Sequence, residues 1–133
     1  MSDINNLRII LNFGIGFQLH DIRDKQQIII KGHIFIDQLL KKVSETDSFY
    51  KKTLFLQEYD AKKELIDLLI EFNRIRNHIA HEVKEIDDQV LIKWSNRVLK
   101  YFSSDYKIRK TKRTIIILAI TAISNELFQT LYQ

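Results

Sequence analysis

Residues 60–82 read DAKKELIDLLIEFNRIRNHIAHE, and this stretch decides the fold class. Its apolar residues recur at alternating steps of three and four, which is the spacing of one face of an α-helix. The residues on this apolar stripe are Leu65, Leu68, Phe72, Ile75 and Ile79. Asp60 is the expected N-cap, because a carboxylate there accepts a hydrogen bond from one of the first free amides of the helix.

Similar apolar spacing predicts helices along the rest of the chain. In one of them Ile22, Ile29, Ile36 and Val43 recur every seven residues, as in a helix packed lengthwise on others. The expected helices cover about residues 4–13, 20–43, 49–57, 88–103 and 112–131. Asp87 or Asp88 should cap the fourth of these.

Residues that interrupt helices are scarce. The chain has three Gly and no Pro in 133 residues, whereas average usage would give about nine and about seven. Sandwiches and barrels need Gly in their turns, and α/β folds usually need it at helix ends. We therefore predict one all-α domain over residues 1–133, an up-and-down bundle of four main helices with one or two short extra helices.

Several kinds of site are excluded by what the chain lacks. It has no Cys, which excludes disulfides, iron–sulfur clusters and thiol catalysis. His78 and His81 can share a helix face, but zinc needs a third and usually a fourth ligand. Residues 14–16, GIG, lack the third glycine of a dinucleotide-binding loop. We expect no metal and no cofactor, and His33, beside Gly32, suits a buried, hydrogen-bonded structural role.

The sequence also predicts where the protein acts. The apolar residues near the N-terminus are interrupted by Asn5, Asn6 and Arg8, so no secretory signal is expected. The longest near-apolar run, residues 114–123, is half the length that a membrane span needs. We expect a cytoplasmic protein with no membrane partner.

Polar residues at the end of the stripe helix are the candidates for chemistry. At about 100° per residue, Arg76 lies roughly 60° from the centre of the stripe, on its flank. Asn77 and His81 lie about 160° from that centre and point away from the core. Two interpretations remain open: the pair is functional, or it belongs to an ordinary solvated face. Arg76 and His81 are about 140° apart, so they meet only if the helix breaks near Ala80 or if a second copy of the chain supplies one of them.

The stretch Arg76-Asn77-His78-Ile79-Ala80-His81 resembles the R-x4-6-H motif of HEPN domains (higher eukaryotes and prokaryotes nucleotide-binding). Residues 32–40, GHIFIDQLL, are similar to a Gly-x-x-x-Ile-acid-x-Leu-Leu pattern in the second helix of that family. The resemblance implies a metal-independent endoribonuclease that acts as a homodimer, often as a toxin or a phage-defence effector. It also implies RNA as substrate, and an antitoxin or regulatory protein as a further partner.

The resemblance assigns a role to each motif residue. RNA is cleaved when the 2′-hydroxyl attacks the adjacent phosphodiester. His81 would act as general acid or base, because an imidazole exchanges protons near neutral pH. Arg76 would clamp the phosphate and stabilise the phosphorane, and Asn77 would orient His81 or hold a substrate oxygen. Arg74 and His78 are supporting candidates.

Two related branches leave an alternative open. HEPN toxins paired with nucleotidyltransferase antitoxins carry a Tyr two residues after the motif His, where this chain has Val83, so silencing through modification of that Tyr is not expected. The mannitol-operon repressor family has a similar Arg-Asn-x-x-Ala-His stretch and is not counted among the nucleases. The alternative is a non-catalytic, HEPN-like dimeric regulatory module in which Arg76 and His81 serve the interface.

The net charge of +4 comes from one basic cluster. The cluster consists of Lys107, Arg109, Lys110, Lys112 and Arg113. Without these five of its 21 basic residues, the chain nearly balances its 17 acidic ones. Lys and Arg near phosphates contribute salt-dependent affinity that is independent of sequence. The cluster is therefore a candidate RNA-binding segment, with a solvated helix start as the alternative.

Overall fold

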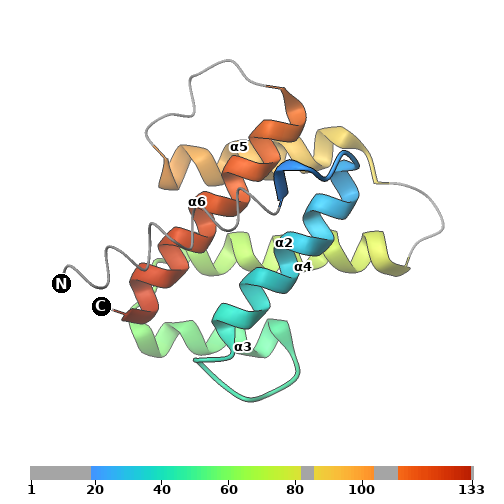
Figure 1. The fold of residues 1–133 in the computed structure, drawn as a ribbon. Helices are drawn as coiled ribbons and strands as arrows, with labels where there is room; N and C mark the ends of the chain where they lie inside the picture. Colours follow the sequence, from blue (N-terminus) through green and yellow to red (C-terminus); the bar gives the residue numbers. More distant parts are fainter. Residues whose placement is uncertain (1–18, 82–85, 104–110, 133) are drawn as a thin grey trace.

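The computed structural model describes residues 19–81, 86–103 and 111–132 (Figure 1). The helices in these ranges are α2 (Lys25–Leu40), α3 (Phe49–Phe55), α4 (Lys63–His81), α5 (Asp88–Phe102) and α6 (Lys112–Tyr132). A 3-10 helix, η1 (Leu56–Tyr59), continues α3, and these ranges contain no strand. The predicted all-α bundle of four main helices is confirmed. The helix expected over residues 4–13 lies outside the described residues.

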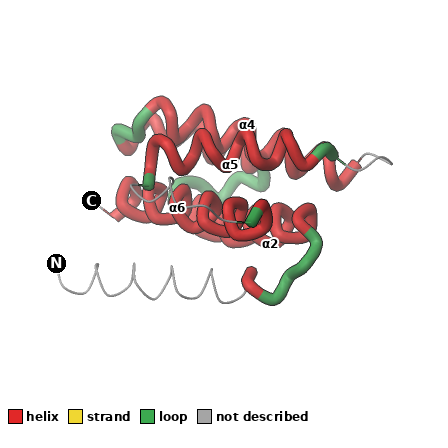
Figure 2. The backbone as a smooth tube through the Cα atoms, turned by 90° about the horizontal axis from the view of Figure 1, so that it is seen from above, coloured by secondary structure: helices red, strands yellow, loops and turns green. Residues whose placement is uncertain are grey.

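The four main helices form two layers. α2 and α6 lie side by side in one layer, and α4 and α5 form the other (Figure 2). In Figure 1, α2 and α6 cross α4 and α5 obliquely, and α3 runs alongside α4 at the C-terminal end of α2. The short helix α3 therefore closes the bundle on the side where α2 meets α4.

Apolar side chains predicted from the stripe fill the space between the layers. Leu65, Leu68 and Phe72 of α4 are fully buried, as is Trp94 of α5. The rings of Phe72 and Trp94 stack with their centroids 4.7 Å apart. The indole N–H of Trp94 donates to the carbonyl of Leu68 at 2.9 Å, which satisfies the polar atom of this buried side chain.

Of the predicted helix starts, that of α5 agrees with the structure, and those of α2 and α4 differ. Asp87 caps α5 as predicted and accepts a hydrogen bond from the amide of Gln89 at 2.9 Å. α2 begins five residues later than expected because Asp24 caps it. The prediction that Asp60 caps α4 is wrong: Asp60 ends η1 in the left-handed conformation, with φ of 57°. Asp tolerates this conformation better than most residues because its short side chain bonds locally.

α6 matches the predicted helix 112–131 within one residue, and it extends beyond the near-apolar run 114–123. It has 21 residues and a mean hydropathy of 1.5 over its most apolar window, so by length and composition it is long enough to cross a membrane. It is the one such helix among the described residues. Half of that window is buried inside the protein, where α6 packs on α2 and α5. The buried half of the window belongs to the core of the bundle.

Candidate functional site

The motif residues lie on the C-terminal half of α4, which runs unbroken to His81. Arg76 is half-buried on the flank of the helix, and Asn77 and His81 are exposed, as the helical angles predicted. The helix does not break near Ala80. Arg76 and His81 therefore stay on different faces of one helix, and a single copy of the chain does not bring them together.

Arg76 lines a polar hollow of about 520 Å³ between α4, α2 and the start of α3. Its guanidinium donates to Oδ1 of Asn77 at 3.2 Å, and both residues lie on the wall that α4 contributes. The other residues of the hollow that bear on its chemistry are Asn73 from α4, His33, Ile34 and Asp37 from α2, Lys41 at the C-cap of α2, Asp47 and Ser48 from the loop, and Tyr50 from α3. The motif Arg thus faces amides, charged groups and one exposed tyrosine.

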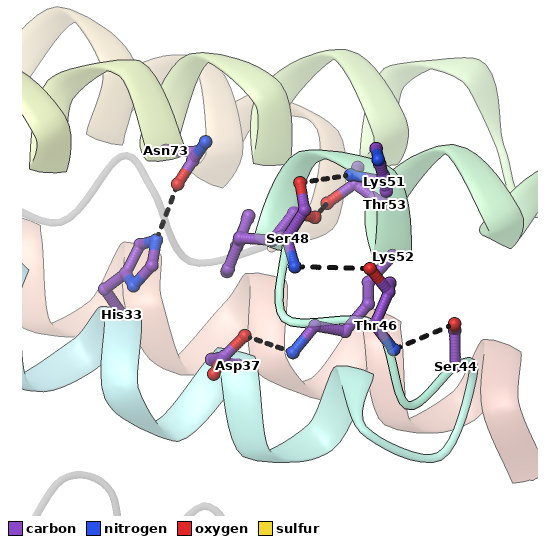
Figure 3. Close-up of polar contacts among 10 residues, drawn as sticks. His33, Asp37, Ser44, Thr46, Ser48, Lys51, Lys52, Thr53 and Asn73 are labelled. Carbon is purple, nitrogen blue, oxygen red and sulfur yellow. Dashed lines mark hydrogen bonds and ion pairs between the residues drawn. The ribbon is translucent and has the colours of Figure 1, made fainter.

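His33 forms the buried wall of this hollow. It is 7% exposed, and its ring stacks on Phe49, with the centroids 4.2 Å apart, and on Phe72. Its Nε2 lies 2.9 Å from Oδ1 of Asn73 (Figure 3), which requires an N–H at Nε2 that donates to this oxygen. The predicted structural role is confirmed. Burial lowers the pKa of His33, and it outweighs the bond to Asn73, which acts in the opposite direction; the charge of Arg76 also lowers it.

One ion pair joins α3 to Asp37 of α2, which lines the hollow. Nζ of Lys52 lies 2.7 Å from Oδ1 of Asp37, and Lys52 is only 2% exposed (Figure 3). Ser48 caps α3 and accepts a hydrogen bond from the amide of Lys51 at 3.2 Å. A buried ammonium is stable only with a partner. The pair therefore fixes the position of α3, which carries Tyr50 and Phe49 into the hollow.

The two supporting candidates lie elsewhere. Arg74 and His78 are four residues apart on α4 and line a second hollow of about 400 Å³, together with Asp87 and Val90. The structure thus separates them from Arg76. His81 lines neither hollow and is exposed at the last residue of α4.

The basic cluster is only partly described. Lys107, Arg109 and Lys110 lie outside the described residues. Lys112 is exposed in the first turn of α6 and lines a further hollow together with Lys93 of α5. This hollow has two cations on its rim, which is compatible with an anionic partner.

Arg113 has a structural use. It is half-buried, and its guanidinium donates to the backbone carbonyls of His20 and Ile22, the latter at 3.2 Å. These bonds attach the segment before α2 to the start of α6. Arg113 is thus held by the protein's own backbone in a way that the sequence did not indicate.

Asn73 is the residue of the hollow that the sequence could have revealed. It lies three residues before Arg76 and four before Asn77, so the three side chains are neighbours on the helix surface. Asp37, the acidic residue of the pattern in residues 32–40, comes from α2, and Tyr50 comes from α3; no local pattern indicates that either lines the hollow with Arg76. Within residues 19–81, 86–103 and 111–132, no group of three or more His, Asp or Glu is placed to hold a metal ion.

Comparisons with protein-family models, with curated proteins and with solved structures find no match to this chain. The resemblance to HEPN domains therefore rests on residues 76–81 and on the pattern in residues 32–40.

Proposed function

We propose that this chain is a metal-independent endoribonuclease of the HEPN type, a cytoplasmic toxin or antiviral effector that works as a homodimer. The observation that carries the proposal is the half-buried guanidinium of Arg76, which lines a polar hollow and is steadied by Asn77 at 3.2 Å. Arg presents a planar fork of donors that matches phosphate oxygens. One and a half turns further along the same helix, the exposed imidazole of His81 is open to substrate or to a second copy.

The proposed reaction needs a proton transfer and a charge clamp. The 2′-hydroxyl oxygen attacks the adjacent phosphorus, and His81 accepts the hydroxyl proton or donates one to the leaving 5′ oxygen. Arg76 binds the non-bridging oxygens, where negative charge develops in the phosphorane. Oδ1 of Asn77 accepts from Arg76, which leaves the Asn77 amide nitrogen for a substrate oxygen. The products are a 2′,3′-cyclic phosphate and a 5′-hydroxyl.

Two features support a second copy of the chain as part of the site. On the unbroken helix, five residues advance by about 7.5 Å and turn by about 140°, so Arg76 and His81 of one copy diverge. Ile34 and Tyr50, which line the hollow beside Arg76, are 46% and 48% exposed. Two α4 helices related by a two-fold axis would cover these side chains and set Arg76 of one copy near His81 of the other.

The same exposed apolar side chains favour a second candidate. In a non-catalytic regulatory dimer, Ile34 and Tyr50 would be buried between copies, and Arg76 and His81 would contribute polar contacts to that interface. This candidate predicts a stable dimer without RNA cleavage. Substitution of Arg76 or His81 would then weaken the dimer.

Cleavage of total RNA and transfer RNA in the presence of a chelator separates the two candidates. We expect wild-type protein to leave cyclic phosphate ends, and Arg76→Ala and His81→Ala each to lose about 10²–10⁴-fold in rate, the usual share of general acid–base catalysis. His20→Ala is the matched control, because His20 is also exposed and lies outside the motif. No cleavage by wild-type protein, with weaker dimers of the two variants in sedimentation, would support the regulatory candidate instead.

A further inference from the structure

Asn73 connects the buried imidazole to the open hollow. It lies one helical turn before Arg76 and lines the same hollow. Its Oδ1 is occupied by Nε2–H of His33 at 2.9 Å, and Figure 3 shows the amide nitrogen on the side away from the imidazole. Across the described ranges, this nitrogen has no hydrogen-bond partner. Two N–H donors of Asn73 are thus left for a ligand.

The imidazole of His33 and the amide of Asn73 constrain each other's orientation. The ring of His33 stacks on Phe49 and Phe72, with centroid distances of 4.2 and 5.7 Å, which fixes its plane. A donor at Nε2 requires the amide oxygen opposite it and repels the amide NH2 group. Burial lowers the pKa of His33, which favours the uncharged ring in this wall.

The charges around the hollow favour an anion. Arg76 and Lys52 are near enough to His33 to lower its pKa, whereas the carboxylate of Asp37 raises it and is paired with Lys52 at 2.7 Å. These two cations and one carboxylate leave one net positive charge beside the wall. Lys41 and Asp47, which also line the hollow, carry opposite charges.

We propose that Asn73 and Arg76 together form a phosphate subsite in this hollow, and that His33 is a positioning residue that keeps the Asn73 amide nitrogen turned toward the phosphate. The identification of that phosphate as one of RNA rests on the function proposed above. Arg76 binds one or two phosphate oxygens with its planar fork, and Asn73 donates to a further oxygen. His33 does not touch the phosphate.

Substitution of Asn73 by Asp provides a sharp test. Asn73→Asp keeps an acceptor oxygen for His33, so the wall should remain folded, but it replaces the two donors by a carboxylate oxygen that repels phosphate. Gln57→Glu is the matched control, because it makes the same amide-to-carboxylate change at an exposed position of η1, outside this hollow and outside the hollow of Lys93 and Lys112. His33→Gln and His33→Met form a second pair: Gln can still donate to Asn73, and Met cannot.

Two probes are titrated: inorganic phosphate and a 2′-O-methyl RNA oligonucleotide, which lacks the attacking hydroxyl. We expect both probes to shift the side-chain amide NMR signal of Asn73 with saturation. Asn73→Asp should bind the oligonucleotide about tenfold more weakly or worse, whereas Gln57→Glu should change affinity by less than about twofold. His33→Gln should bind like wild-type protein, and His33→Met should bind more weakly.

Each result bears on one part of the proposal. Saturable phosphate binding at Asn73 without oligonucleotide binding keeps the subsite and contradicts the RNA function. Equal affinity of Asn73→Asp and Gln57→Glu for both probes overturns the subsite, even if wild-type protein cleaves RNA. Equal affinities of His33→Gln and His33→Met overturn the positioning role of His33.

Discussion

A Cβ atom at Gly32 would lie 2.7 Å from Cδ1 of Ile120, which is closer than two carbon atoms can approach. Gly32 is buried on α2, and Ile120 is fully buried on α6. The two helices of this layer therefore meet at a position that only glycine fills without a shift of its neighbour. This contact lies one residue before His33, so it also sets how far the imidazole reaches toward α4.

Gly32→Ala should destabilise the protein by about 1 kcal/mol. Overpacking costs about 1–3 kcal/mol, and about 1 kcal/mol is recovered because Ala favours the helix. Ile120→Val removes the closest carbon, so the two substitutions should be less damaging together than their separate effects add up to. Urea denaturation of the four proteins measures this. A Gly32→Ala protein more stable than wild type would contradict this prediction, because it would show that Ile120 or α6 shifts to admit the added Cβ without a net loss of stability.

Asp37→Ala should be more damaging than Lys52→Met. Removal of the carboxylate leaves the ammonium of Lys52 buried without a partner, which costs about 3 kcal/mol. Lys52→Met puts an apolar chain of similar length into the same site, and the remaining carboxylate is one-third exposed to water, so a loss below about 1 kcal/mol is expected. Lys51→Met, at the exposed neighbouring position, is the control for thermal unfolding. The reverse order of stabilities would contradict the role of this pair.

His33 should make stability depend on pH. Its pKa in the folded protein is lowered by burial, so the unfolded chain takes up the proton at a higher pH than the folded one. The contribution of the neutral His33 ring to the free energy of unfolding is then complete above about pH 6.5. It is lost as pH falls through that value toward the pKa of His33 in the folded protein. The free energy of unfolding of wild-type protein should decline between about pH 7 and about pH 5, and less so in His33→Gln. His20→Gln should keep the wild-type decline, and an equally steep decline in His33→Gln would speak against the prediction.

Mixing the inactive Arg76→Ala and His81→Ala proteins should restore part of the cleavage. If one copy supplies Arg76 and the other supplies His81, a mixed dimer keeps one of its two sites intact. Equal mixing makes half of the dimers mixed, so about a quarter of the wild-type activity should return. Subunit exchange is checked by sedimentation of differently labelled chains. Exchange without any return of activity would exclude a site shared between copies.

The sequence predicted the fold best where periodicity alone decides burial. Leu65, Leu68 and Phe72 are fully buried, because a helix with one continuous apolar face has one side to turn inward. Periodicity does not say which of several Asp residues ends a helix. Asp60 takes the left-handed conformation as the chain turns from η1 into α4, and the amide of Ala61 closes that turn on the carbonyl of Leu56 at 3.3 Å.

The candidate site was predictable only as far as one helix determines it. Helical angles assigned Arg76 to the flank of α4 and Asn77 to its outer face, and both positions are confirmed. The wall behind Arg76 depends on the bond between His33 and Asn73, which are 40 residues apart in sequence. That bond forms only after α2 has packed on α4, and no pattern within either segment encodes it.

Because α4 is helical through His81, the distance between Arg76 and His81 within one chain is fixed, and no hinge lies between them. With a site shared between copies, no movement inside one chain can complete it or take it apart. With such a shared site, protein concentration would control the activity. A monomer would not cleave RNA, and at low concentration the rate would rise with the square of the protein concentration. Dilution would inhibit cleavage by dissociating the dimer, and a partner bound to the outer face of α4 would inhibit it by blocking dimer formation.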